Sequence, residues 1–194
     1  LYLFGQFWAD YTSFPITDKN LIMHGYPYLL DQIKKTTILK NRKKIIFISQ
    51  GTIGKELSKF FYEVAKKLPD YQFIYKLHPG EIYNWESNYP LLIRAQTLDN
   101  VEIREKSNIY EDFSESMIQV GVYSTALFEG IAFNCKTILL SLPGIEYMGD
   151  LIKTNYVQVV SNVEEFKNAI QSDYKSELSS EYFFHKVDEK VKVN

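Results

Sequence analysis

The chain has 194 residues, of which 45% are hydrophobic and 24% charged, and its formal net charge is -2. This composition allows a full core and is typical of a soluble globular protein. The slightly acidic balance gives no overall attraction to nucleic acid, and no apolar run approaches the length of a membrane span. A single cysteine, Cys135, excludes an internal disulfide and fits the reducing cytoplasm, and because no Cys/His cluster or D-x-D pair is present we expect no metal ion.

Residues 1–42 form an N-terminal arm that is dense in aromatic residues and shows no sustained period. The sequence begins with Leu1, and we interpret the arm as the exit from a missing N-terminal domain, with its aromatics as the interface. Between Lys34 and Lys44 there are six basic residues in eleven and no acidic one. Such a run is either a solvated linker or a peripheral contact with the anionic inner face of the cell membrane or with a lipid-linked substrate.

Residues 43–173 alternate short β-type runs with helical periods. The six predicted strands are Ile45–Ser49, Gln72–Leu77, Val101–Arg104, Ile118–Tyr123, Thr137–Ser141 and Tyr156–Val160. The clearest predicted helices are Glu56–Lys67 and Val163–Ile170, the latter preceded by a capping box from Ser161 to Glu164. This alternation predicts an α/β fold, a Rossmann-like doubly wound parallel sheet of about six strands that binds ligands at the carboxyl ends of its strands.

The segment 174–194 is predicted as a C-terminal helical tail. Leu178, Tyr182, Val187 and Val191 recur at roughly helical spacing among charges. The pattern fits either an amphipathic helix that docks elsewhere or a frayed terminus.

The first strand is followed by S-Q-G-T-I-G-K, from Ser49 to Lys55. Its glycine spacing is not that of a P-loop, and Glu56 follows the lysine where a P-loop has Ser or Thr. Gly51 and Thr52 are either donor-binding residues, because a backbone without side chains can approach a ligand closely, or part of a flexible turn. In the strand order 3-2-1-4-5-6 this turn lies close to Ser124 and Thr125.

The second strand ends in Y-K-L-H-P-G-E, from Tyr75 to Glu81. Pro79 restricts the preceding residue to extended conformations and so holds His78 in one orientation, and alternation puts Lys76 on the same side. A positioned imidazole can protonate or charge-pair with a leaving phosphate, which makes His78 the catalytic candidate. The alternative is a histidine that only caps the strand through a backbone hydrogen bond.

The stretch from Met117 to Asn134 reads as strand, tight turn and helix. Ser124 and Thr125 stand at the predicted helix N-terminus, where unpaired N–H groups and two hydroxyls suit a phosphate. Glu129 lies four residues further on the same face, where a carboxylate suits the hydroxyl pair of a ribose. The alternative is an ordinary Ser/Thr cap followed by a surface glutamate.

The His78–Pro79 pair and the Y-S-T-A-L-F-E-G stretch (Tyr123 to Gly130) resemble bacterial GT-B glycosyltransferases, namely sialyl- and polysialyltransferases, capsule polysaccharide transferases and CDP-glycerol glycerophosphotransferases. The likeness covers about residues 43–170 and implies the C-terminal, donor-binding domain of a GT-B fold. It implies that His78 contacts or protonates the leaving phosphate, that Ser124 and Thr125 bind that phosphate, and that Glu129 holds the ribose. The general base of these enzymes usually lies in the N-terminal domain, and no residue here matches it.

These patterns predict a metal-independent transferase of cell-envelope biogenesis that moves a sugar or polyol-phosphate unit from a CMP- or CDP-linked donor to a glycan or lipid-linked surface polysaccharide. The nucleotide donor is a substrate, and no separate cofactor is expected. As an isolated domain the chain is expected to bind nucleotide weakly and to transfer nothing. Two alternatives stay open, a UDP-sugar 2-epimerase-like enzyme and a non-catalytic nucleotide-sugar-binding domain.

Overall fold

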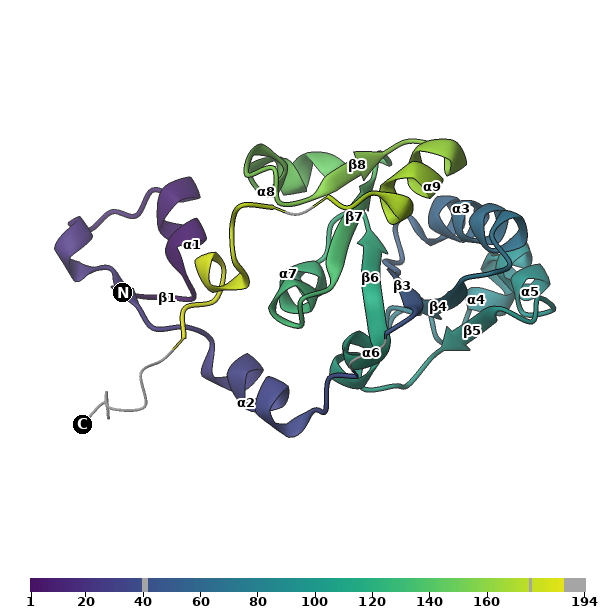
Figure 1. Cartoon of the computed structure of the whole chain (residues 1–194), viewed down its shortest axis with the longest axis horizontal. Coiled ribbons are helices and arrows are strands. Elements are labelled where there is room, and N and C mark those ends of the chain that lie inside the picture. The colour runs from purple at the N-terminus through teal and green to yellow at the C-terminus, as the bar shows by residue number, and fades with distance from the viewer. Residues whose placement is uncertain (40–41, 175, 187–194) are drawn as a thin grey trace.

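A computed structural model describes residues 1–39, 42–174 and 176–186 of the chain. Within these residues the centre is a parallel six-stranded sheet of order β5-β4-β3-β6-β7-β8 (Figure 1). Its strands are β3 (Lys44–Ile48), β4 (Gln72–Lys76), β5 (Val101–Arg104), β6 (Ser116–Gly121), β7 (Lys136–Leu140) and β8 (Gln158–Val160). The predicted fold class and strand order are confirmed, with most strand ends one or two residues from their predicted positions.

The four inner strands, β4, β3, β6 and β7, are buried on both faces, which explains their nearly continuous apolar runs. In β3, Ile45 and Phe47 belong to the core on one face of the sheet, and Ile46 and Ile48 belong to the core on the other. Because side chains alternate across a strand, a single run of β-branched and aromatic residues supplies both cores.

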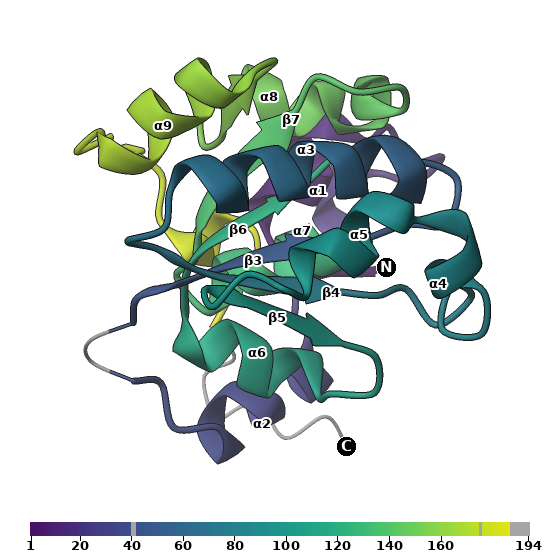
Figure 2. The ribbon, with the colours of Figure 1, turned by 90° about the vertical axis from the view of Figure 1, so that its right-hand side faces the viewer.

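Helices cover the two faces of the sheet in separate groups, with α3 and α5 to one side and α6 and α7 to the other (Figures 1 and 2). Packed on the first core are α3 (Gly54–Lys67), α4 (Trp85–Asn88), α5 (Pro90–Ala95) and α9 (Val163–Gln171). Packed on the second are α2 (Pro27–Lys35), α6 (Ile109–Glu115), α7 (Thr125–Ala132), the 3-10 turn η2 (Ile145–Met148) and α8 (Gly149–Lys153). The structure therefore has the three layers of a doubly wound fold.

Helix α9 begins at Val163 as predicted, but its cap lies one residue later than predicted. Asn162 is the N-cap and accepts a hydrogen bond from the Glu165 N–H at 2.9 Å. The Glu165 carboxylate in turn accepts one from the Ser161 N–H at 2.7 Å. The capping residue stands directly before the first helical residue, so Asn162 and Glu165 take the places predicted for Ser161 and Glu164.

The N-terminal arm contains β1 (Tyr2–Leu3), α1 (Gln6–Tyr11), the 3-10 turn η1 (Asp18–Asn20) and β2 (Ile22–Met23), with β1 and β2 pairing in parallel. Phe7 of α1 is 4% exposed, with ring centroids 5.6 Å from Phe128 of α7 and 5.1 Å from Phe183. Part of the aromatic arm, expected to face a partner outside the chain, thus packs within it. Tyr2, at 56% exposure, remains open to solvent.

The C-terminal segment returns to this arm, so that the two ends of the described chain lie side by side (Figure 1). The Trp8 indole N–H donates to the Phe183 carbonyl at 3.0 Å, and the His185 N–H donates to the Phe4 carbonyl at 2.7 Å. Between residues 176 and 186 the helical structure is the 3-10 turn η3 (Ser180–Tyr182). Val187 and Val191, on which the predicted tail helix depended, lie outside the described residues.

Several charges of the basic run serve the fold. Arg42 donates to the Phe133 carbonyl at 2.8 Å, near the end of α7, and Lys44 pairs with Glu115 at 2.8 Å. In the part of the chain that the structure describes, no helix combines the length and hydropathy required to cross a bilayer.

Candidate functional site

A cavity of about 470 Å³ opens at the carboxyl ends of the central strands. It is bounded by the ends of β3 and β4, the loop between β5 and α6, and the start of α7, as expected for a doubly wound sheet. Its lining residues are Ile48, Ser49, Lys76, Leu77, His78, Pro79, Ile82, Glu105, Lys106, Ser107, Ile109, Ser124 and Ala126.

The cavity brings together four of the eight predicted site residues, namely Lys76, His78, Pro79 and Ser124. Among the described residues, its lining leaves out Gly51, Thr52, Thr125 and Glu129. The four that it includes come from the ends of two strands that are separated in the sheet only by β3.

Ser124 is the N-cap of α7. Its hydroxyl oxygen accepts a hydrogen bond from the Ala126 N–H at 3.3 Å, so its own hydrogen can still be donated to a ligand. The Ala126 and Leu127 N–H groups both donate to Ser124, so the helix N-terminus contributes chiefly the positive end of the helix dipole. Thr125, the first helical residue, is exposed. The start of α7 is therefore suited to an anion.

His78 is exposed at the cavity, and its ring is fixed by its own turn. The Gly80 N–H donates to Nδ1 of His78 at 3.1 Å. Because Nδ1 is an acceptor, the neutral ring carries its hydrogen on Nε2. The histidine is therefore bonded to the backbone of its own turn and keeps one donor, Nε2–H, at the cavity.

Glu81, which the sequence analysis did not select, organises this corner of the site. Its carboxylate is buried, and Oε1 accepts hydrogen bonds from the Ser49 hydroxyl at 2.9 Å and the Tyr89 hydroxyl at 2.8 Å. Oε2 accepts from the His78 N–H at 2.7 Å. All three donors are neutral groups, so hydrogen bonds and not an ion pair hold this buried charge.

The N-terminus of α3 lies against the same carboxylate. A Cβ at Gly54, the first residue of α3, would lie 2.3 Å from both Oε1 of Glu81 and the Tyr89 hydroxyl, so only glycine fits. A carboxylate near a helix N-terminus is stabilised by the dipole. Burial raises the pKa of Tyr89, and the hydrogen bond to Glu81 raises it further, which keeps that hydroxyl a donor.

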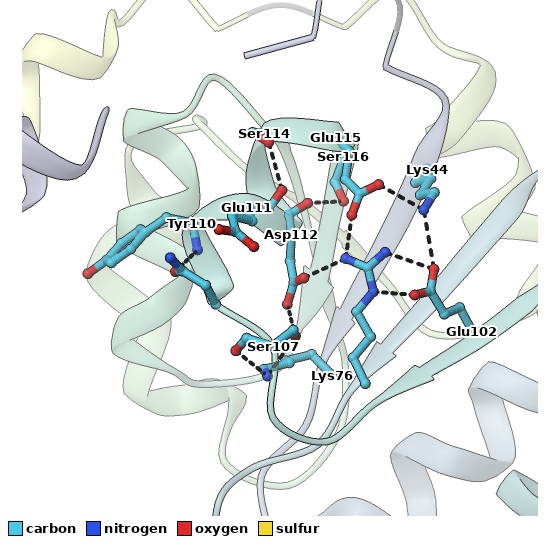
Figure 3. A network of polar contacts seen from close by, with 12 residues as sticks. Lys44, Lys76, Glu102, Ser107, Tyr110, Glu111, Asp112, Ser114, Glu115 and Ser116 are labelled. Atoms are coloured by element: carbon cyan, nitrogen blue, oxygen red, sulfur yellow. Dashed lines mark hydrogen bonds and ion pairs between the residues drawn. The ribbon is translucent and has the colours of Figure 1, made fainter. Parts of the chain in front are cut away.

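Lys76 lines the cavity and bonds to the β5–α6 loop, which forms another of its walls. Its ammonium donates to the carbonyl and the hydroxyl of Ser107, each at 2.8 Å, and that hydroxyl donates to Asp112 at 2.6 Å (Figure 3). Burial lowers the pKa of Lys76, against an opposing effect of Asp112. Lys76 therefore fixes the β5–α6 loop as well as offering a positive charge to the cavity.

Arg104 continues this polar network behind the loop. It pairs with Asp112, whose side chain is 1% exposed, and with Glu102 and Glu115 (Figure 3). Lys44 of β3 joins the two glutamates from the other side. The loop that lines the cavity is thus anchored to a chain of alternating charges.

Two other predicted residues have different partners. The Thr52 hydroxyl contacts the Tyr123 hydroxyl, which brings the turns after β3 and β6 together as predicted. Glu129 lies near Tyr110, whose pKa is raised by burial and further by this carboxylate. Gly51, which precedes Thr52 in the turn after β3, is exposed.

Among the described residues no group of three or more His, Cys, Asp or Glu side chains is placed to hold a metal ion.

The sheet and its strand order define a Rossmann-like doubly wound fold, and solved structures with similar folds were compared with it. No protein-family model and no curated protein matches the chain. Among solved structures it is similar to the UDP-GlcNAc 2-epimerase of Neisseria meningitidis bound to UDP-GlcNAc, with a TM-score of 0.59 at 17% identity over 80% of this chain and 46% of that one.

The UDP-GlcNAc 2-epimerase of Methanocaldococcus jannaschii, in complex with UDP-GlcNAc and UDP, gives a TM-score of 0.57 at 13% identity over 80% of this chain and 48% of that one. The wall teichoic acid polymerase TagF gives 0.53 at 13% identity over 88% and 47%. The chain spans about half the length of these structures. It therefore has the fold of one half of a GT-B protein, as the resemblance implied, and at these identities the likeness shows the fold alone.

Proposed function

We propose that this chain is the donor-binding half of a glycosyltransferase. It binds a CMP- or CDP-linked donor and takes part in moving a sugar or polyol-phosphate unit to a glycan or lipid-linked acceptor of a bacterial surface polysaccharide. The observation that carries the proposal is the cavity in which Lys76, His78 and Ser124 converge.

These residues have complementary roles toward a donor phosphate. The Ser124 hydroxyl and the positive end of the α7 dipole bind its oxygens, and the His78 Nε2–H donates one further hydrogen bond. Lys76 supplies positive charge from the wall of the cavity. Hydrogen bonds that strengthen as charge develops on the leaving phosphate lower the barrier to transfer.

For a CMP-sugar donor the transfer is a substitution at the anomeric carbon. The acceptor oxygen forms a bond to that carbon, the bond from the carbon to the phosphate oxygen breaks, CMP leaves with the electron pair, and the acceptor proton passes to a base. We assign no residue of this chain as that base. By itself the chain is accordingly expected to bind nucleotide without transfer.

Titration of the chain with CMP, CDP, UDP and GDP tests the proposal. A ligand that binds only the folded state stabilises it by about 2.7 kcal/mol at a hundred times its Kd, so CMP or CDP should raise the melting temperature and release heat in calorimetry. A saturating series that leaves both signals unchanged would remove the proposed function.

Other outcomes support the two alternatives. Preferential UDP binding, together with conversion of UDP-GlcNAc in the absence of acceptor, would indicate an epimerase-like enzyme. Tight binding of CMP by the complete protein, with no transfer to any glycan acceptor, would indicate a nucleotide-sugar-binding domain without catalysis.

A further inference from the structure

We infer that Glu81 is the positioning residue of this site and acts on the donor through His78. The inference rests on the proposed function for its ligand and on the hydrogen bonds around Glu81 for its mechanism. Nothing in the sequence marks this glutamate, which follows His78 by three residues.

Three hydrogen bonds fix His78 within its own turn. The His78 N–H donates to Oε2 of Glu81 at 2.7 Å, and the Glu81 N–H donates back to the His78 carbonyl at 2.9 Å. The Gly80 N–H holds the ring at Nδ1. Pro79 restricts the backbone of His78 to extended conformations. Together these contacts hold the His78 backbone in one conformation and its Nε2–H in one direction.

The other carboxylate oxygen ties this turn to the rest of the sheet. Oε1 accepts from Ser49, which follows β3 and lines the cavity, and from Tyr89, which precedes α5. Glu81 is 4% exposed, so these contacts are shielded from solvent. The carboxylate therefore sets where His78 stands relative to β3 and the cavity wall.

A glutamate suits this position because its ionised side chain is an acceptor at both oxygens. Glutamine can satisfy the same geometry, since its carbonyl oxygen can accept from the His78 N–H while its amide hydrogens donate to the two hydroxyl oxygens, which rotate to accept. Alanine leaves the His78 N–H and both hydroxyls without their acceptor. Glu81→Ala therefore removes both the hydrogen bonds that position His78 and the negative charge, whereas Glu81→Gln removes only the charge.

The test is a double-mutant cycle with CMP as the titrant. His78→Ala removes a hydrogen bond to a charged group, which is worth about 1.5–3 kcal/mol, or roughly a tenfold to hundredfold rise in Kd. Glu81→Ala should cause most of that loss. In the His78→Ala background it should cause almost none, because residues that act through one another are not additive.

Three comparisons make the cycle decisive. Glu81→Gln should restore most of the affinity, and Glu86→Ala, on the exposed surface of α4, should leave it unchanged. If Glu81→Ala does not fold, Glu81→Asp replaces it, because a side chain one methylene shorter cannot reach both Ser49 and the His78 N–H. Fully additive losses, or a glutamine variant as weak as the alanine variant, would overturn the inference.

A second readout needs no nucleotide and therefore separates this inference from the proposed function. In the ¹⁵N-labelled chain, the His78 ring signals, assigned by their absence in His78→Ala, should show the Nε2–H tautomer. Glu81→Ala should give a mixture of both tautomers. An unchanged tautomer would overturn the positioning role, whereas a failed CMP titration with the expected tautomer change would overturn only the proposed function.

Discussion

The hydrogen bond from Gly80 to Nδ1 limits the chemistry of His78. A neutral imidazole with its hydrogen on Nε2 can donate to a phosphate oxygen, but it has no second proton to give away. To act as a general acid the ring would have to become an imidazolium, whose Nδ1–H would face the Gly80 N–H. Of the two roles that the resemblance implied for His78, contact with the phosphate or its protonation, the geometry favours contact through a hydrogen bond.

Gly54 tests how tightly the carboxylate of Glu81 is enclosed. Gly54→Ala places a methyl group 2.3 Å from Oε1 of Glu81, and overpacking of this kind costs about 1–3 kcal/mol. Alanine is otherwise favoured over glycine in a helix by about 1 kcal/mol. Gly149→Ala, at the first residue of α8 with no atom within 4 Å of its Cβ, should show only that gain. Chemical denaturation of both variants should give free energies of unfolding that change in opposite directions, and changes of the same sign would contradict the packing argument.

At the scale of helices, α7 and α9 share the same kind of cap and differ in what lies beyond it. Ser124→Ala and Asn162→Ala each remove a side-chain acceptor at an N-cap, which costs about 1 kcal/mol of stability. Ser124 also lines the cavity, so only its variant should weaken CMP binding. Thermal melts and titrations of the pair check this. If Asn162→Ala also lost CMP affinity, the weaker CMP binding of Ser124→Ala would be a consequence of its lower stability and not of a lost contact in the cavity.

The network behind the β5–α6 loop should make stability depend on acid pH. The Arg104 hydrogen bond lowers the pKa of Glu102, and hydrogen bonds from Arg104 and Lys44 lower that of Glu115 although burial opposes them. Both folded-state pKa values lie below the ordinary 4.5, so the unfolded chain binds more protons there. The stability contributed by these groups is complete above that value and is lost as the pH falls through the folded-state values.

Arg104→Met should remove much of this acid dependence and should also destabilise the fold at neutral pH. It leaves Asp112, with a side chain 1% exposed, with the Ser107 hydroxyl but without the arginine of its ion pair, and breaking a buried pair in this way costs about 3–5 kcal/mol. Lys35→Met breaks the exposed pair with Asp31 and should change little. Denaturant unfolding between pH 3 and 7 measures both effects. Equal stability of the two variants at pH 7 would contradict the assignment of Asp112 as a buried partner of Arg104.

The sequence predicted the positions of those strands and helices that depend on a local pattern of residues. The β-branched runs located the strands, and Leu57, Phe61 and Val64 located α3. The part that it missed depends on contacts between distant segments. Glu81 reads as an ordinary turn glutamate because Ser49 and Tyr89, which bury it, come from other elements. Glu129 has the predicted helical placement, but the side chain whose pKa it raises, that of Tyr110, comes from α6.

For the whole molecule, the arm and the doubly wound body form one packed structure in the described residues. Phe7, Phe183 and Leu29 belong to the same core as Ile46 of the central strand and Leu127 of α7. The sequence could not predict this, because aromatic residues without a period give no indication of the surface that they cover. We therefore expect the arm to unfold together with the sheet.

Phe7→Ala tests this coupling. Phe7 is 4% exposed and its ring lies against Phe128 and Phe183, so truncation should cost about 3–5 kcal/mol and lower the melting temperature of the whole chain in one transition. Tyr2→Ala removes an aromatic ring of the same arm that is 56% exposed, and should change stability much less. Differential scanning calorimetry, with circular dichroism as a second probe, measures both variants. If Phe7→Ala instead released the arm while the sheet melted at its original temperature, the arm would belong to a separate folding unit. It would then not be part of the core that supports α7 and, through α7, the part of the cavity that Ser124 lines.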